Sequence, residues 1–244
     1  MAEYPQELYE RLKNNAEAVR ANIARACEEA GRNPSTVTLV GVSKVFPVEY
    51  AQAAFEGGLK DLGENRVQEL VPKIERLEEL GLHPNWHLIG TLQRNKVKYI
   101  IGKTYLIHSV NTVELAQEIA KRSEAAGITT DILLQGNISG EESKHGFAPS
   151  ELKQAVEAVN ALTGVRLRGL MTMAPIETSP GDARPIFEKT REIYEALRAD
   201  VKDPSCWDTL SMGMSGDYKE AILEGSTCVR VGTAIFGDRN ALKA

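Results

Sequence analysis

Apolar residues recur at helical spacing near the start of the chain. Leu8, Leu12 and Ile23 are separated by charged and polar side chains, and this period is typical of an amphipathic helix that buries one face. The pattern predicts a helix over residues 5–30, with Gly31 as its C-terminal cap. Because this helix comes before the first predicted strand, it lies outside the alternating pattern that follows.

From residue 37 onward, short apolar runs alternate with segments of helical periodicity. The runs are rich in Val, Ile and Leu and are bounded by Asn, Pro and Gly, which is typical of buried strands. The predicted strands cover residues 37–43, 59–63, 86–89, 105–110, 130–138, 165–173, 209–212 and 228–236. The predicted helices between them cover residues 48–56, 66–80, 93–101, 112–126 (capped by Asn111), 149–162, 182–200 and 218–224.

The alternation of eight predicted strands with helices indicates parallel strands joined by crossover helices. Eight such units in a chain of 244 residues are typical of a closed barrel rather than an open sheet. We therefore expect one domain over residues 1–244, an eight-stranded parallel β/α (TIM) barrel with an extra N-terminal helix.

Composition narrows the range of partners. The net charge is −5, and basic residues do not form a long run, so the sequence predicts neither nucleic-acid binding nor attraction to an acidic membrane. No apolar run approaches the ~20 residues of a membrane helix, and residues 1–7 lack the basic and apolar regions of a signal peptide. We expect a cytoplasmic protein.

The three cysteines are Cys27, Cys206 and Cys228. They are odd in number and scattered, and their spacing matches no metal site. We therefore expect no metal, a reducing compartment, and cysteines that act as small buried apolar residues.

A lysine directly follows the first predicted strand. Residues 38–43 read Thr-Leu-Val-Gly-Val-Ser, and Lys44 comes next. Partial burial at a strand end lowers the pKa of a lysine, and a neutral amine is a nucleophile. A lysine that simply extends its ammonium into solvent explains the same position, so Lys44 taken alone leaves both interpretations open.

Two glycine-containing stretches lie at the seventh and eighth predicted strands. Residues 211–217 read Ser-Met-Gly-Met-Ser-Gly-Asp, and residues 229–237 read Val-Arg-Val-Gly-Thr-Ala-Ile-Phe-Gly. Backbone N–H groups of such loops, a serine hydroxyl and the start of a helix together bind anions. Barrels of this class often bind phosphate with the loops after strands seven and eight. A tight turn explains either loop alone equally well.

The carboxyl ends of barrel strands meet at one rim, where the active sites of this fold lie. Lys44 after strand one, an anion site after strands seven and eight, and Arg230 on strand eight would therefore face one another. This set fits pyridoxal 5′-phosphate (PLP), because a lysine amine condenses with its aldehyde to form an internal aldimine, a Schiff base, while its phosphate needs a cradle.

Seven stretches, in order, resemble the pyridoxal-phosphate homeostasis protein family, the proline synthase co-transcribed homologues: LVGVSKVFP, LGENRVQEL, WHLIGTLQRNKVK, IHSVN, GEESKHGF, GLMTMAP and LSMGMSGDYKEAILEGSTCVRVGTAIFG. That family resembles the N-terminal barrel of alanine racemase, which is fold type III among PLP enzymes. The resemblance implies that Lys44 forms the Schiff base and that Arg230 meets the pyridine nitrogen. The other cofactor-binding residues that we expect are Asn65 and Met214 and, around the phosphate, Ser215, Gly216, Gly232 and Thr233.

The resemblance implies a PLP-binding protein of PLP homeostasis that buffers the cofactor or delivers it to apo-enzymes. An amino-acid racemase-like fold-type III enzyme is the alternative, and a barrel enzyme without this cofactor is a weaker third. An arginine is a charged donor, so at the ring nitrogen it disfavours protonation and weakens the ring as an electron sink. In alanine racemase the second base is a tyrosine of an additional C-terminal domain, and a chain ending at Ala244 is expected to lack that domain. We therefore expect a monomer with no established catalytic residue.

Three further residues near the predicted rim have two explanations each. Asn65 either contacts the ring or Lys44, or it caps the helix that starts at Arg66. His145 and Lys144 lie on a polar loop that could admit or release cofactor, with Lys144 as a transient acceptor, or that is simply solvated.

The remaining candidates are expected to have structural roles. His87 and His108 lie on predicted strands and are expected to be hydrogen-bonded core histidines. Met171 and Met173 are expected to pack the barrel. Gly136 interrupts the apolar fifth strand, which it is expected to weaken while leaving room near the ring.

Overall fold

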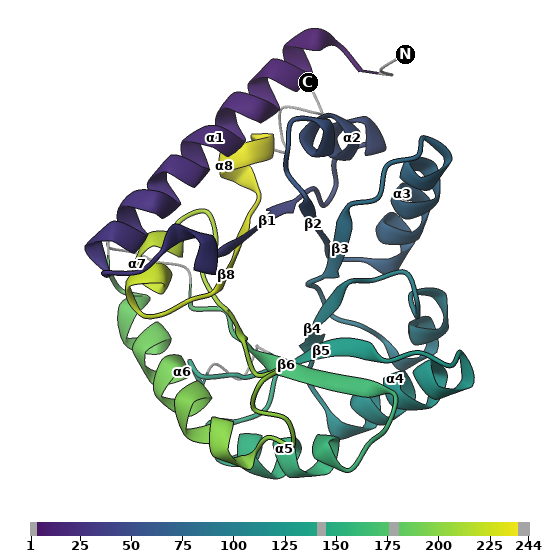
Figure 1. The fold of residues 1–244 in the computed structure, drawn as a ribbon, viewed down its shortest axis with the longest axis vertical. Helices are drawn as coiled ribbons and strands as arrows, with labels where there is room; N and C mark the ends of the chain where they lie inside the picture. The colour runs from purple at the N-terminus through teal and green to yellow at the C-terminus, as the bar shows by residue number, and fades with distance from the viewer. Residues whose placement is uncertain (1–3, 141–144, 176–180, 239–244) are drawn as a thin grey trace.

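The computed structural model describes residues 4–140, 145–175 and 181–238 of the chain. Within these ranges, eight parallel strands form a closed barrel in chain order, and β8 pairs with β1. Figure 1 shows the ring of strands with the helices outside it. The strands are β1 (Thr38–Val42), β2 (Asp61–Glu64), β3 (Asn85–Leu88), β4 (Leu106–Val110), β5 (Thr130–Gln135), β6 (Val165–Met171), β7 (Thr209–Ser211) and β8 (Cys228–Val231). The predicted eight-stranded barrel is confirmed.

Helices connect successive strands. The α-helices are α1 (Gln6–Glu29), α2 (Val48–Glu56), α3 (Val67–Glu79), α4 (Val113–Ala125), α5 (Leu152–Asn160), α6 (Arg184–Leu197), α7 (Tyr218–Leu223) and α8 (Thr233–Phe236). Short 3-10 helices are η1 (Pro34–Thr36), η2 (Arg94–Tyr99), η3 (Pro149–Glu151) and η4 (Arg198–Asp200).

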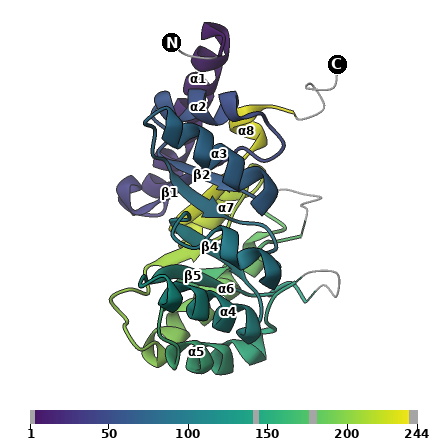
Figure 2. The same ribbon diagram turned by 90° about the vertical axis from the view of Figure 1, so that its right-hand side faces the viewer.

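The N-terminal helix α1 precedes the alternating units, as predicted. It runs along one side of the barrel beside α2, α7 and α8 (Figures 1 and 2). Leu8, Leu12, Val19 and Ile23 lie on its buried face. Because α7 packs on β8 and α8 packs on β1, α1 buries its apolar stripe where the barrel closes.

Strand β1 is apolar on both faces because both are covered. A Cβ atom at Gly41 would lie 2.1 Å from Leu59 Cδ2, on the side of the surrounding helices. A Cβ atom at Gly63 of β2 would lie 2.9 Å from Val40 Cγ1, on the inner side. A strand enclosed in this way reads as a continuous apolar run rather than an alternating one.

The eighth predicted strand is wrong in its second half. Strand β8 ends at Val231, and residues 233–236 form α8. Gly232 has φ −107° and ψ −79°, and its carbonyl accepts hydrogen bonds from the amides of Ile235 and Phe236. A short apolar run does not distinguish a buried strand from a buried helical turn, which explains the error.

Two other local predictions are also corrected. Residues 94–99 form the 3-10 helix η2 rather than an α-helix, and Val97 is its buried residue, so little packing supports a longer helix. Helix α4 is capped by Thr112, not by Asn111, because the Thr112 hydroxyl accepts a hydrogen bond from the Leu115 amide at 3.1 Å.

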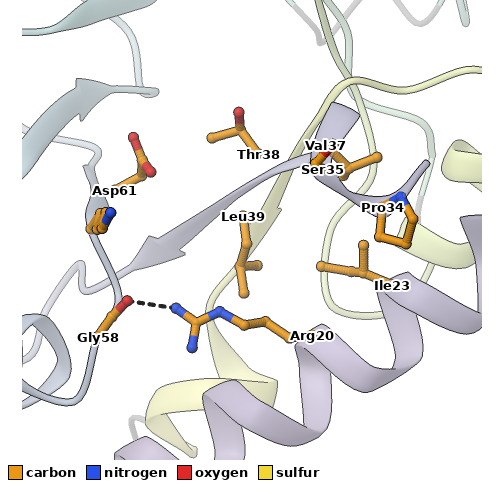
Figure 3. A pocket seen from close by; sticks show the side chains of 10 residues that line it. Arg20, Ile23, Pro34, Ser35, Val37, Thr38, Leu39, Gly58 and Asp61 are labelled. Atoms are coloured by element: carbon orange, nitrogen blue, oxygen red, sulfur yellow. Dashed lines mark hydrogen bonds between the residues drawn. The ribbon is translucent and has the colours of Figure 1, made fainter.

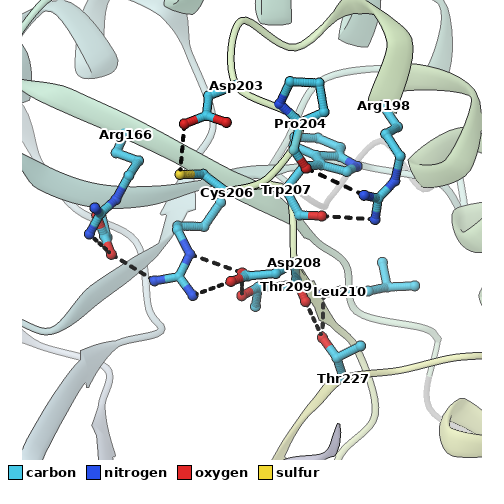
Figure 4. A network of polar contacts seen from close by, with 12 residues as sticks. Arg166, Arg198, Asp203, Pro204, Cys206, Trp207, Asp208, Thr209, Leu210 and Thr227 are labelled. Carbon is cyan, nitrogen blue, oxygen red and sulfur yellow. Dashed lines mark hydrogen bonds and ion pairs between the residues drawn. The ribbon is translucent and has the colours of Figure 1, made fainter.

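A network of ion pairs ties β5, β6 and β7 together where these strands begin (Figure 4). Arg166 donates to Asp131 at 2.7 Å, and Arg168 bridges Asp131 at 2.8 Å and Asp208 at 2.6 Å. In barrels of this class the N-terminal face of the strands contributes to stability rather than to chemistry. We assign these charges to holding the strand starts in register.

Cys27 and Cys228 are buried, as predicted, whereas Cys206 is partly exposed and its thiol donates to Asp203 at 3.2 Å. None of the helices in the described ranges has the length and apolar character needed to span a bilayer. The described residues also contain no cluster of three or more His, Cys, Asp or Glu side chains suited to a metal ion.

Candidate functional site

A cavity of about 460 Å³ opens at the carboxyl end of the strands. Loops after β1, β2, β3, β7 and β8 contribute to its wall. The structure places all eight of the residues expected from the sequence around it: Lys44, Asn65, Met214, Ser215, Gly216, Arg230, Gly232 and Thr233. Residues more than 180 positions apart in the chain therefore share one cavity, as the geometry of a closed barrel requires.

Lys44 lies two residues beyond Val42, and both line the cavity. The next residue, Val45, has φ +65°, which is strained for a β-branched side chain. Its amide donates to Glu69 Oε2 of α3 at 2.8 Å. A helix outside the barrel therefore fixes the turn that follows Lys44.

A buried charge pair fixes the other side of Lys44. The Lys73 ammonium of α3 donates to the Ser43 carbonyl at 2.9 Å and to Glu64 Oε1 at 2.5 Å. The Ser43 hydroxyl donates to the same Glu64 oxygen at 2.7 Å. All three side chains are buried. The residues on both sides of Lys44 are thus held by charged side chains of α3 and β2.

The Glu64 carboxylate is only partly satisfied in this network. Its Oε2 atom is buried and accepts no hydrogen bond from any described residue. Burial raises the pKa of Glu64 above its usual value, although the Lys73 ammonium opposes the shift. The Glu64–Lys73 ion pair therefore fixes the position of the chain next to Lys44. Because both charges are desolvated, the pair adds little to the net stability of the fold.

The loop after β7 folds back on itself around Asp217. Gly213 has φ +95°, and a Cβ atom there would lie 2.6 Å from the Ala221 Cβ, so the position requires glycine. The Asp217 carboxylate accepts a hydrogen bond from the Met214 amide at 2.5 Å. Burial raises the Asp217 pKa, and that hydrogen bond opposes the shift. The loop is therefore held both by its own backbone, through the Met214 carbonyl, and by the Asp217 carboxylate.

Ser215 joins this loop to the one after β8. Its hydroxyl oxygen accepts hydrogen bonds from the amides of Gly232 at 3.2 Å and Ala234 at 3.5 Å. Two backbone N–H groups thus converge on the Ser215 oxygen at the cavity wall, which leaves the hydroxyl hydrogen of Ser215 to donate to an anion. This donor set fits a phosphate group.

Arg230 is 3% exposed and lines the same cavity. Its Nη1 donates to Ser211 Oγ at 2.5 Å, and its Nη2 donates to the Thr172 carbonyl at 2.9 Å. Burial lowers the pKa of the guanidinium, but arginine stays charged at neutral pH. With five N–H donors in total, Arg230 is suited to donating to a ligand atom that bears a lone pair.

The alternative explanation of Asn65 as a helix cap is wrong. Helix α3 is preceded by Arg66, and no side chain caps it. Asn65 instead lines the cavity, where its backbone lies against Gly90: a Cβ atom on Gly90 would be 2.3 Å from the Asn65 carbonyl oxygen.

Sequence reasoning missed several cavity residues: Val42, Ile89, Gly90, Thr91 and Gln135. Three of these follow β3 directly, and Gln135 is the polar last residue of β5. The rule that strand ends form the rim could have identified them. Gln135 donates to the carbonyl of His145, which also lines the cavity.

His87 and His108 are buried inside the barrel, hydrogen-bonded to each other at 2.8 Å, and do not line the cavity. Their prediction as core histidines is confirmed. Met171 packs against Leu106 and Leu133 as predicted, whereas Met173 also reaches the cavity wall.

Gly136 does not leave room near the ring. A Cβ atom there would lie 3.0 Å from Ile138 Cδ1 and 3.5 Å from Leu152 Cδ1, which are not cavity residues. Strand β5 ends just before it. The expected role of Lys144 as an acceptor concerns a residue outside the described ranges.

The fold and this site define a class of protein. Residues 15–240 match the family profile described as alanine racemase, N-terminal domain. The fold is also similar to that of alanine racemase from Clostridium difficile, with a TM-score of 0.73 at 18% identity over 94% of this chain and 60% of that one. The class is therefore the barrel of the alanine racemase N-terminal domain.

Closer relatives define the family. The pyridoxal phosphate homeostasis protein of Aquifex aeolicus is 45% identical over 91% of this chain and 95% of its own length, and that of Escherichia coli K12 is 37% identical over 95% and 98%. PipY of Synechococcus elongatus, solved with PLP bound, has a TM-score of 0.75 at 32% identity over 88% of this chain and all of that one. The chain belongs to the pyridoxal phosphate homeostasis protein family.

Proposed function

We propose that this protein binds PLP reversibly in the cavity at the barrel rim, as a Schiff base on Lys44, and serves PLP homeostasis by buffering or delivering the cofactor. The observation that carries the proposal is the convergence of Lys44, Arg230 and the amides near Ser215 on one cavity. Membership in the family, together with the PLP-bound relative, supports the choice of ligand.

Each wall of the cavity has a separate task in this proposal. When bound, PLP supplies an aldehyde that an amine captures and a pyridine ring that withdraws electrons. Lys44 provides the amine, while Ser215, Gly216, Gly232 and Thr233 hold the phosphate with hydroxyl and backbone donors. Asn65 and Met214 complete the pocket.

The role of Arg230 bears on whether the protein catalyses a reaction. A guanidinium can only donate, so at the ring nitrogen it keeps that nitrogen unprotonated and limits carbanion stabilisation. Racemisation also needs a base on each side of the substrate carbon. Among the described residues that line the cavity, His145 is the one candidate for a second base beside Lys44, and it lies on an exposed segment. We therefore propose a carrier rather than a racemase.

Incubation of PLP-loaded protein with D- and L-alanine separates the two functions. A carrier is expected to convert neither enantiomer faster than free PLP does. Turnover well above that background, lost in His145→Ala, would support the racemase and contradict the carrier.

Delivery is tested by mixing loaded protein with the apo form of a PLP-dependent enzyme and measuring recovered activity. If activity recovers faster with the loaded protein than with the same total amount of free PLP, the result supports delivery. Equal rates of recovery limit the role to buffering.

We place this exchange in the cytoplasm, between a monomeric carrier and transient recipients. Sedimentation of the loaded protein tests the monomer.

A further inference from the structure

A line of polar side chains crosses the interior of the barrel. It consists of Asp61 on β2, His87 on β3, His108 on β4, Ser211 on β7 and Arg230 on β8, and we refer to it as the axial relay. Successive atoms are within hydrogen-bond distance: Asp61 Oδ1 to His87 Nε2 is 3.1 Å, His87 Nδ1 to His108 Nε2 is 2.8 Å, His108 Nδ1 to Ser211 Oγ is 2.9 Å, and Ser211 Oγ to Arg230 Nη1 is 2.5 Å.

The donors of this relay can be assigned from its two ends. Arg230 can only donate, so the Ser211 oxygen accepts from it. The Ser211 hydroxyl then donates to His108 Nδ1, its nearest nitrogen acceptor. Burial, followed by the nearby His87 and Arg230, lowers the pKa of His108 well below its usual value, so His108 is neutral and carries its one proton on Nε2.

The remaining steps follow from that proton. His108 Nε2–H donates to His87 Nδ1, which must therefore be unprotonated. His87 then carries its proton on Nε2 and donates it to the Asp61 carboxylate. In this order every donor has an acceptor, and the relay runs from a cation to an anion.

The reverse order is disfavoured. It would turn the Ser211 hydroxyl toward another acceptor, of which the neighbouring Cys228 sulfur is a weak one. It would also require one more proton, on His87 or on Asp61, inside the barrel that already encloses the buried Arg230 cation.

The two ends of the relay open at different cavities. Arg230 lines the proposed PLP cavity, whereas Asp61 lines a second cavity of about 600 Å³ near the start of β1. Figure 3 shows Asp61 there with Thr38 of β1 and with Arg20 of α1, whose guanidinium donates to the Gly58 carbonyl. The Asp61 side chain is 19% exposed, whereas His87, His108 and Ser211 are essentially buried.

We propose that His87, His108 and Asp61 act as positioning residues for Arg230, and that the axial relay makes the hydrogen bonding of Arg230 depend on the charge at the opposite end of the barrel. The proposal rests on the proposed function only for the role of Arg230 toward PLP. The direction of the relay is a property of the protein without cofactor.

The first test uses protein without PLP, labelled with ¹⁵N at histidine. The chain has four histidines, and exposed His83 serves as an internal reference. A two-bond ¹H–¹⁵N spectrum is expected to show both His87 and His108 as Nε2–H tautomers. A His108 with its proton on Nδ1, or on both nitrogens, would overturn the relay.

Substitutions at His87 test the coupling, because His87 does not touch the PLP cavity. In protein labelled with ¹⁵N at both histidine and arginine, His87→Leu removes the acceptor of His108 Nε2–H and is expected to shift the His108 and Arg230 signals. His87→Gln supplies an amide oxygen that can accept from His108 and an amide nitrogen that can donate to Asp61, so it is expected to restore these signals. If His87→Leu does not fold, Asp61→Ala at the open end of the relay carries the test, and unchanged His87 and His108 signals would then contradict it.

A second readout uses the loaded protein. His87→Leu is expected to shift the absorption maximum of bound PLP and to weaken its retention roughly threefold to tenfold, and His87→Gln is expected to restore both. Asp208→Asn is the matched control, because Asp208 is a carboxylate at the same end of the barrel but outside the relay (Figure 4). This variant is expected to change neither the spectrum nor the retention of PLP.

An unchanged spectrum in His87→Leu would refute the coupling to the cofactor. A wild-type protein that binds no PLP would refute the proposed function instead, and the tautomers would still decide the relay.

Discussion

The two walls of the cavity are built in different ways. The Lys44 wall depends on charged side chains of α3, namely Glu69 at the strained Val45 and Lys73 with the buried Glu64. The wall formed by the loops after β7 and β8 depends on backbone amides that meet at Ser215. The first wall is therefore sensitive to charge, whereas the second is sensitive to backbone conformation.

This contrast suits the tasks that we propose for the two walls. A Schiff-base lysine needs one fixed direction, and buried ion pairs can specify a single geometry at a cost in stability. A phosphate is recognised by several equivalent donors, and backbone amides supply them without side-chain entropy. Substitutions that break one wall are expected to leave the other intact.

The largest effect is expected from Lys73→Met. It leaves Glu64 buried without its charge partner, and loss of such a partner costs about 3–5 kcal/mol in the free energy of unfolding. Urea denaturation measures the loss, and Glu64→Gln added to Lys73→Met is expected to recover part of it. Lys189→Met, which removes an exposed ion pair with Glu192, is the control and is expected to have little effect. Equal stability of the two lysine variants would show that the buried pair has no structural role.

The next largest effect is expected at the other wall, from Gly213→Ala. The new methyl group meets Ala221 at a positive φ, which is expected to cost about 1–3 kcal/mol. Gly216→Ala in the same loop is the matched control, because nothing lies within 4 Å of its added Cβ and its φ is not positive. Thermal unfolding compares the two, and similar losses would contradict the difference in backbone demand.

Ser215→Ala is expected to act on binding more than on stability. It removes the hydroxyl shared by the two loops, and a lost hydrogen bond to a charged ligand is worth about 1.5–3 kcal/mol, or roughly tenfold or more in PLP affinity. Fluorescence titration with PLP measures the change. Ser205→Ala, on an exposed segment distant from the cavity, should bind as the wild type does. Unchanged affinity in Ser215→Ala would remove Ser215 from the phosphate site.

The smallest effect is a pH dependence from Glu64. Its pKa is raised in the folded state, so the folded protein holds this proton more tightly than the unfolded chain does. The stability due to Glu64 is therefore greatest below its unfolded pKa of about 4.3 and falls as pH rises through the raised value. The free energy of unfolding of both proteins is measured across this range. The value for Glu64→Gln is expected to increase relative to that of the wild type as pH rises. If the free energy of unfolding of Glu64→Gln minus that of the wild type stays constant or falls as pH rises, the pKa of Glu64 is not raised in the folded state.

Sequence patterns were sufficient for the barrel and for its rim. Eight apolar runs alternating with amphipathic helices identified the fold, and the convergence of strand ends placed Lys44 and Arg230 at one mouth. These inferences succeed because period and topology are properties of whole segments. Single boundaries failed where two structures share one pattern, as at Gly232, where the apolar run continues from β8 into α8.

The supporting contacts could not be read from the sequence. Lys73 meets Ser43 and Glu64 only because α3 packs outside β2 and β3, and the relay from Asp61 to Arg230 joins five strands across the barrel interior. Such contacts depend on register and on side-chain direction. The strain at Val45 could not be predicted either, because no sequence signal indicates that a valine adopts a left-handed backbone conformation.

The central claim is that Lys44 is the amine that holds PLP opposite the loops after β7 and β8. The most direct measurement is borohydride reduction of the PLP-loaded protein followed by peptide mass mapping. We expect the reduced pyridoxyl-phosphate adduct on the peptide that contains Lys44, and none after reduction of Lys44→Ala. An adduct on another lysine in the wild type, or an equal yield in Lys44→Ala, would contradict the account.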